Sequence, residues 1–286
     1  MTLFLQSLVN GIIAGSIYSL FAVGLTLIYG VFNFINFAHG ELIMLGAYFF
    51  YLFINPPFSF IIPFALILSL FFTSIAGLMI NRFVYQPLKN SSHLTLLIST
   101  LGLSIFLRNF AQFIWGAQIR DYHFELKRGF LIGGISITTI QIVIILTSII
   151  IIFLLYFLFS HTIIGKSMRA MSDSQVLSRI VGLNVKKITI YVWITASSLA
   201  AIGGILLGAD TNLQPGMGLI NLIKAFAATL LGGVGNIWGA LWGGFIIGVA
   251  ENLGIWVISP GYKDGIAFAI ILVMLLFRAK TIFLKS

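Results

Sequence analysis

Four polar side chains stand close together between two hydrophobic runs near the start of the chain: Asn33, Asn36, His39 and Glu41. Such groups are costly in hydrocarbon, so in a membrane segment they normally face protein, an interface or a water-filled path. Amide and carboxylate side chains can also satisfy the backbone groups that a helix break sets free. The cluster predicts either part of a substrate pathway or the support of a helix break. For His39 we expect a hydrogen-bonded structural role, although an imidazole could also sense pH.

A second candidate group consists of glycines in the late hydrophobic run 219–258, namely Gly232, Gly233 and Gly235. This run is too long for a single crossing, since about 20 helical residues span a bilayer. Glycines within it favour a broken helix or a tight helical hairpin, whose unwound backbone must be buried in protein. We therefore assign these glycines, like the earlier polar cluster, to the substrate pathway or to a helix break.

The elements that must position both groups are membrane helices. The chain has 286 residues, of which 59% are hydrophobic and only 8% charged, whereas soluble domains carry about 25% charged residues. The sequence predicts an all-α, polytopic transmembrane bundle of about eight segments. It forms a single domain, 1–286, with broken or re-entrant helices near 30–41 and 232–244. The predicted segments are 5–29, 42–54, 60–80, 94–115, 138–159, 188–209, 219–258 and 265–277.

The charges predict how these segments are oriented. The net charge of +9 indicates basic cytoplasmic loops rather than a nucleic-acid partner, because Lys and Arg gather on the cytoplasmic side of membrane proteins. Basic residues occur near Arg82 and Lys89, within 161–187 and in the tail, which places the C-terminus in the cytoplasm. The stretches 118–128 and 210–218 fit the opposite face. The side of the N-terminus stays open, because two segments could be re-entrant.

Two charged residues lie within or near the ends of late hydrophobic runs. Glu251 could be interfacial or could pair with Lys224 or Lys263. The long stem of Lys224 could alternatively carry its ammonium group to the outer interface. A proton relay through Glu251 is the third interpretation.

The segment 161–187 is the clearest candidate for contact with a partner. Its apolar residues could form one face of a short amphipathic helix, and Gly182 stands where a helix-ending glycine would allow a left-handed turn. Such a helix could dock in a groove of a partner protein or rest on anionic membrane lipid, and the residues do not decide between the two. The apolar residues are Met168, Met171, Val176, Ile180 and Val181.

No catalytic site, metal site or cofactor is predicted. Gly165-Lys166-Ser167 resembles the end of a phosphate-binding loop, but Ser160 stands where that loop needs glycine, and no α/β domain surrounds it. The chain has no cysteine, and its four histidines are scattered. An ATP-driven function would therefore need another subunit, and a membrane-embedded enzyme is not expected.

Several separated motifs, in order, resemble the LivH-type permease subunits of branched-chain amino-acid ABC importers. They are Asn36-Phe37-Ala38-His39-Gly40-Glu41 with Gly46-Ala47-Tyr48, the loop 165–184, and Ala225-Phe226-Ala227-Ala228 with Leu231-Gly232-Gly233. The resemblance spans essentially the whole chain. Two positions depart from the family pattern: Ser178 replaces a usual alanine, and Trp238 stands near a frequent proline.

The resemblance implies a multi-pass permease of a bacterial or archaeal inner membrane. It also implies three kinds of partner: a second homologous permease chain, two cytoplasmic ABC ATPases, and a periplasmic or lipid-anchored binding protein. A homodimer and a heterodimer of permease chains both stay open, and the resemblance favours the heterodimer. The ATPase would contact Gly165, Arg169, Ala170, Asp173 and Gly182. Two alternatives stay open: the same architecture serving urea, short amides or simple sugars, and an ion-coupled secondary transporter using Glu41, Glu251 or Asp210.

Overall fold

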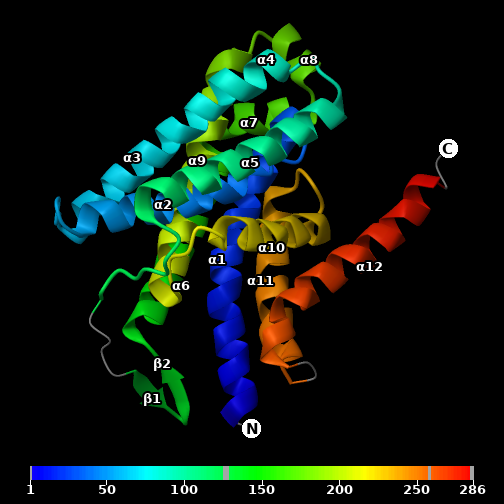
Figure 1. The fold of residues 1–286 in the computed structure, drawn as a ribbon. Helices are drawn as coiled ribbons and strands as arrows, with labels where there is room; N and C mark the ends of the chain where they lie inside the picture. Colours follow the sequence, from blue (N-terminus) through cyan, green and yellow to red (C-terminus); the bar gives the residue numbers. More distant parts are fainter. Residues whose placement is uncertain (1, 125–128, 257–258, 284–286) are drawn as a thin grey trace.

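The computed structural model describes residues 2–124, 129–256 and 259–283, and helices make up most of this part of the chain (Figure 1). The long and medium helices are α1 (Thr2–Phe32), α2 (Ala38–Ile54), α3 (Ile62–Ile80), α5 (His93–Trp115), α6 (Thr139–His161), α9 (Val185–Asp210), α10 (Met217–Gly232), α11 (Ile237–Gly254) and α12 (Lys263–Phe283). The shorter elements are a π-helical turn (Asn81–Tyr85), α4 (Gln86–Leu88), α7 (Ile163–Asp173), α8 (Gln175–Ile180), a 3-10 turn (Pro260–Tyr262) and the strands β1 (Phe130–Ile132) and β2 (Ile135–Ile137).

The predicted all-α, polytopic membrane fold is confirmed. Each predicted hydrophobic segment coincides with a helix, except that 219–258 forms two, α10 and α11. Within the described residues, five helical stretches are long and apolar enough to cross a bilayer: Thr2–Phe32, Ile62–Leu88, His93–Trp115, Thr139–His161 and Val185–Asp210. The helices α2 and α10 are apolar but shorter, as expected for helices that adjoin a break.

Both predicted breaks are present. The first lies between α1 and α2, where Asn33 adopts a positive φ of 55°; asparagine is one of the few side chains that tolerates this region. The second lies between α10 and α11, where Gly233 and Gly235 have φ angles of 89° and 87°. The Asn236 side chain then accepts a hydrogen bond from the Gly239 N–H and caps α11. Residues with access to positive φ therefore stop both helices at the predicted places.

The core is built around α1, which packs along α11 and also contacts α9 and α10. Small residues bring α1 and α11 into backbone contact: a Cβ on Gly248 would lie 2.2 Å from the Gly15 nitrogen, and one on Gly244 would lie 2.4 Å from the Ser19 nitrogen. In the same way, α2 approaches α9 closely at Gly46. Small interfacial residues are the usual means by which membrane helices gain packing energy.

A β-hairpin between α5 and α6 was not predicted. Its turn is Gly133-Gly134, with both φ angles positive, as a two-residue hairpin turn requires. The Gln6 side chain of α1 donates to the Ser136 carbonyl at 3.0 Å and accepts from the Ser136 N–H at 2.8 Å. These bonds fix the hairpin beside the start of α1.

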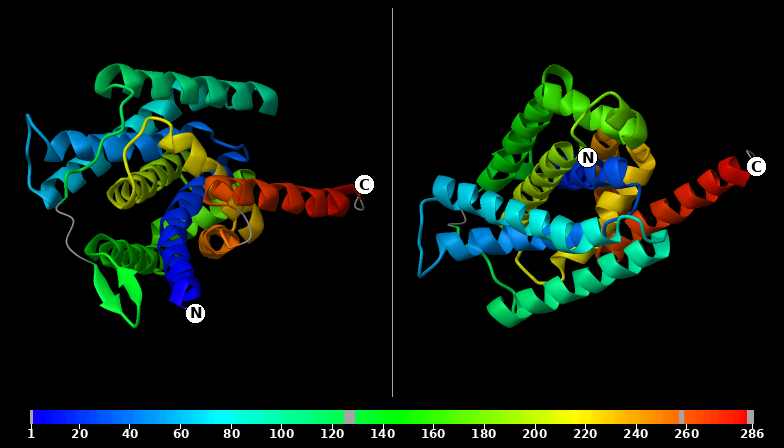
Figure 2. Two further views of the ribbon diagram at one scale, coloured as in Figure 1. Left: turned by 60° about the horizontal axis from the view of Figure 1, so that its bottom comes forward. Right: turned by 90° about the horizontal axis from the view of Figure 1, so that it is seen from above.

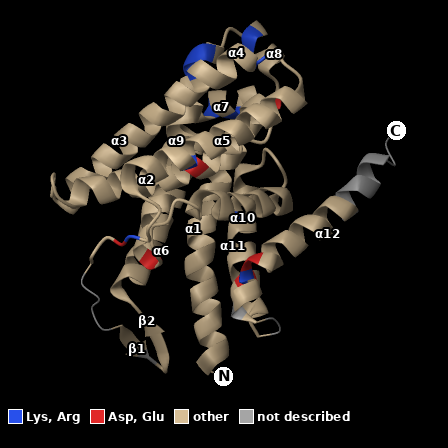
Figure 3. Cartoon of the chain, in the orientation of Figure 1, with Lys and Arg blue, Asp and Glu red and all other residues tan. Residues whose placement is uncertain are grey.

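Lys and Arg gather at one end of the molecule, over α4, α7 and α8 (Figure 3). We call this the basic end. The N-terminus of α1 lies at the opposite end (Figure 1). Arg120 and Leu213 exchange backbone hydrogen bonds of 2.9 and 2.8 Å, so the two stretches predicted to share the other face do meet. Figure 2 shows α12 projecting away from the other helices.

Candidate functional site

The segment 161–187 forms two helices, α7 and α8, rather than a single amphipathic helix. Ser174 interrupts the segment with an extended backbone, and its side chain accepts a hydrogen bond from the Leu177 N–H to begin α8. The proposed common apolar face is therefore wrong. Met168 and Met171 are 2% and 1% exposed and pack inward, while the remaining apolar members, Val176, Ile180 and Val181, are exposed on the surface.

The inward side of α7 packs on the end of α1 and faces the second helix break across a cavity. A Cβ on Gly30, near the end of α1, would lie 2.4 Å from the Ser172 Oγ and 4.0 Å from the Gly235 Cα. The Gln175 amide donates a hydrogen bond to the Val31 carbonyl. A cavity of about 200 Å³ between these elements is lined by residues of α1, α7 and the second break, including Arg169, Asp173 and Trp238. We call this meeting point of α1, α7 and 233–238 the junction.

The predicted coupling residues occupy two kinds of position. Arg169, Ala170, Asp173 and Gly182 are exposed and could reach a partner. Gly165 is buried, and a Cβ there would lie 2.1 Å from the Leu158 carbonyl oxygen, so this glycine allows α7 to turn tightly from α6. Gly182 has a φ of 85°, which confirms the predicted left-handed turn after α8.

The polar residues of the first break do not form one site. Asn33 is exposed at the basic end, whereas Asn36 is buried and accepts a 2.6 Å hydrogen bond from the Tyr85 hydroxyl. His39 is fully buried, and neither ring nitrogen has a hydrogen-bond partner among the described residues. Its ring packs against the backbone of α1 at Gly24, and the expected hydrogen-bonded structural role of His39 stays a prediction.

Glu41 is buried in an ion pair between α2 and α5. Its Oε1 accepts from Arg108 Nη2 at 3.1 Å and from the Ser104 hydroxyl at 2.7 Å. The Glu41 side chain has no exposed surface, and that of Arg108 is 24% exposed. Sequence reasoning missed Arg108, although an arginine inside the hydrophobic run 94–115 was a signal, because intramembrane charges usually have a partner.

A second buried ionic cluster joins four helices. Lys224 Nζ lies 3.2 Å from Glu251 Oε2 and 2.7 Å from Asp264 Oδ1, and the Tyr18 hydroxyl donates to Glu251 at 2.9 Å. Of the partners considered for Glu251, Lys224 is the one found in an ion pair with it. The Lys224 side chain is only 8% exposed, so the expectation that it reaches the outer interface is wrong.

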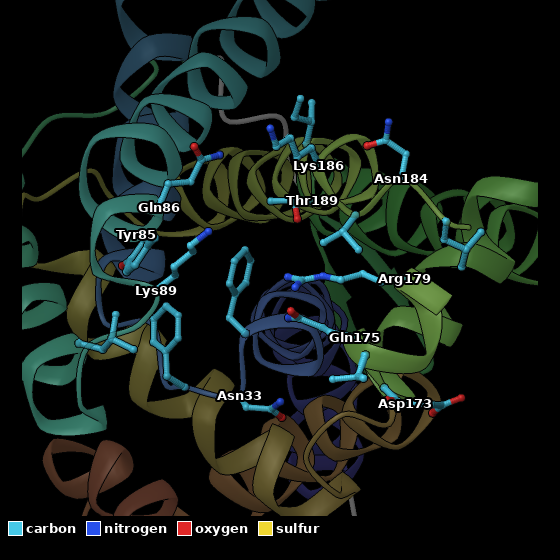
Figure 4. Close-up of a pocket in the computed structure, with 18 of the residues that line it drawn as sticks. Asn33, Tyr85, Gln86, Lys89, Asp173, Gln175, Arg179, Asn184, Lys186 and Thr189 are labelled. Carbon is cyan, nitrogen blue, oxygen red and sulfur yellow. The ribbon is translucent and has the colours of Figure 1, made fainter. Parts of the chain in front are cut away.

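A larger cavity of about 1370 Å³ opens at the basic end, between the first break, the π-helical turn, α8 and α9 (Figure 4). Asn33 lines it, together with aromatic and cationic side chains. The described residues contain no cluster of side chains that could hold a metal ion.

Comparison with known proteins gives a consistent result. A family model described as "Branched-chain amino acid transport system / permease component" matches residues 7–275. The high-affinity branched-chain amino acid transport permease BraD of Pseudomonas aeruginosa is 36% identical, with 96% of this chain and 94% of that protein covered. LivH of Escherichia coli K12 is 33% identical, with 96% and 93% covered.

A ribose import permease, RbsC of Escherichia coli K12, is also similar, but over 42% of this chain and 40% of its own length, at 31% identity. The family model and the two longer matches, by contrast, extend over nearly the whole chain. The chain therefore belongs to the family of permease components of branched-chain amino acid transport systems.

Proposed function

We propose that this chain translocates branched-chain amino acids as one permease subunit of an ATP-binding-cassette importer, by alternating access. The full-length similarity to BraD and LivH supports this cargo. The second permease subunit, a homologous chain, would complete the pathway. Two cytoplasmic ATPases would provide the energy, and a periplasmic or lipid-anchored protein would deliver the substrate.

The geometry of the junction is the main structural support for this mechanism. A partner that moved the exposed side of α7 would act on the end of α1 through Ser172, which lies against Gly30, and the adjoining α8 would act on it through the hydrogen bond from Gln175 to Val31. It would act on the start of α11 through the cavity lined by Gly235 and Trp238. We therefore assign coupling to Gly165, Arg169, Ala170, Asp173 and Gly182, and the basic end, together with the C-terminus, to the cytoplasm.

The two helix breaks serve the pathway in this proposal. Glycines 232, 233 and 235 let α10 turn into α11 beside the junction. Asn33 and Asn36 support the turn from α1 into α2, while His39 packs α2 on α1 and Glu41 joins α2 to α5. The buried ion pairs argue against ion coupling, since Arg108 and Lys224 already neutralise the two buried carboxylates, Glu41 and Glu251.

Arg169→Glu tests the coupling role. We expect this change to reduce co-purification of the ATPases and to abolish leucine uptake, because it reverses the charge of an exposed side chain on α7. Arg82→Glu is the matched control, since Arg82 is an exposed arginine outside the segment 161–187 that does not line the junction cavity. Normal ATPase association and uptake by the Arg169 variant would contradict the proposal.

The partial similarity to RbsC favours simple sugars as the second candidate cargo. Uptake into proteoliposomes that contain the complete transporter separates the two. We expect isoleucine, leucine and valine to compete with labelled leucine, and ribose and urea to have no effect. Uptake of ribose without uptake of leucine would replace the proposed cargo.

A further inference from the structure

The large cavity at the basic end is lined in part by the coupling residues Asp173 and Gly182, and it has further features that coupling to an ATPase does not explain. Its volume of about 1370 Å³ exceeds the roughly 300–1,000 Å³ typical of small-molecule pockets. Three cations from three separate elements line it: Lys89 after α4, Arg179 in α8 and Lys186 at the start of α9. Figure 4 shows Lys89 and Arg179 extending into the cavity from opposite walls.

These cations lack anionic partners in the described part of the chain. No ion pair within 4.0 Å includes Lys89, Arg179 or Lys186. Asp173 is the acidic residue of the lining, but Figure 4 shows its carboxylate directed away from the centre of the cavity. The cavity thus presents uncompensated positive charge, which favours an anionic ligand.

The other walls are apolar. Val176 and Ile190 line the same cavity and are exposed, and Phe34, Tyr85 and Leu96 form an almost fully buried apolar layer at its wall. An inorganic phosphate ion would leave most of this apolar surface uncovered. A ligand that combines an anionic group with a hydrocarbon chain would cover both kinds of surface.

The position of the cations along their helices agrees with such a ligand. Lys89 directly follows the apolar stretch Ile62–Leu88, and Lys186 is the second residue of the stretch Val185–Asp210. The cations therefore lie where membrane helices leave the hydrocarbon, at the depth of lipid headgroups. Basic pockets between membrane helices on this side characteristically bind anionic headgroups.

We propose that this cavity binds one anionic phospholipid, with its phosphate held by Lys89, Arg179 and Lys186 and the start of an acyl chain against the apolar wall. Bound there, the lipid would touch the first break, the π-helical turn and α8 at once. It would therefore connect the membrane to the coupling segment 161–187. The inference rests on the membrane location of the chain and does not depend on the transported substrate.

Native mass spectrometry of the purified full-length chain tests the proposal, with phosphatidylglycerol and phosphatidylcholine as probes. We expect one tightly retained phosphatidylglycerol. Each cation near a membrane surface contributes about fivefold in affinity, so the triple variant Lys89→Gln/Arg179→Gln/Lys186→Gln should bind it about 100-fold more weakly. The single variant Arg179→Gln should show about a fivefold loss and guards against misfolding of the triple variant.

The matched control is Arg82→Gln/Lys166→Gln/Lys187→Gln, which removes the same charges from exposed residues that do not line the cavity. It should retain the lipid. Equal binding of the two lipids, an equal loss in the control, or displacement by millimolar inorganic phosphate would overturn the proposal. So would a triple variant that keeps the lipid but loses a co-purifying ATPase, since the cavity would then be a protein-docking surface.

Discussion

Removing the ammonium group of Lys224 should destabilise the protein strongly. The Lys224 and Glu251 side chains are 8% and 0% exposed, and their charges lie 3.2 Å apart. At an effective dielectric constant of about 20, that separation corresponds to roughly 5 kcal/mol of attraction. Lys224→Met would leave the Glu251 carboxylate buried with Tyr18 as its remaining hydrogen-bond donor. Breaking a buried pair in this way typically costs about 3–5 kcal/mol, which is our expectation for the free energy of unfolding.

The assay is reversible unfolding in mixed detergent micelles, followed by tryptophan fluorescence. The double variant Lys224→Met/Glu251→Leu should recover most of the loss, because replacing both members of a buried pair by apolar groups is often neutral. Asp264→Asn is the control: it removes the other carboxylate bound to Lys224, but that side chain is 55% exposed, so the cost should stay below about 1 kcal/mol. A Lys224→Met cost below about 1 kcal/mol, or strictly additive effects in the double variant, would refute the reasoning.

Three further substitutions test the breaks and the hairpin. Gly232→Val should prevent the α10–α11 turn and sharply reduce folded yield after size-exclusion chromatography, since a Cβ there would lie 2.0 Å from the Gly239 carbonyl carbon. Tyr85→Phe should lower the free energy of unfolding by about 1–3 kcal/mol, because the buried Asn36 oxygen loses its donor; an unchanged unfolding curve would contradict this. Gln6→Ala should release the β1–β2 hairpin and accelerate its cleavage in limited proteolysis, without altering the global unfolding transition.

The sequence predicted those parts of the fold that depend on local properties of the chain. Hydrophobic length located the helices, because a bilayer requires about 20 apolar residues per crossing. Backbone preference located both breaks, because Asn33, Gly233 and Gly235 adopt positive φ. Basic residues far apart in the chain, such as Lys89 and Arg179, were expected on one side of the membrane, and they do line one cavity.

The partners of buried polar groups were harder to predict, because they depend on how the helices are arranged. Nothing near Asn36 in the sequence indicates Tyr85, which lies 49 positions away. The single amphipathic helix expected in 161–187 failed for a local reason: the extended backbone of Ser174 separates α7 from α8. The hairpin was missed although Gly133-Gly134 is a typical two-residue turn, because its strands have only three residues each.

The packing of α1 on α11 limits how a movement of α7 could spread. Their backbones touch at four glycines, Gly11, Gly15, Gly244 and Gly248, and close-packed interfaces of this kind do not deform continuously. Both helices also reach the junction, α1 through Val31 and α11 through its first turn. We therefore expect a displacement of α7 to move α1 and α11 together. The conformational change would then occur at looser contacts, such as that of α5, which packs mainly on α2.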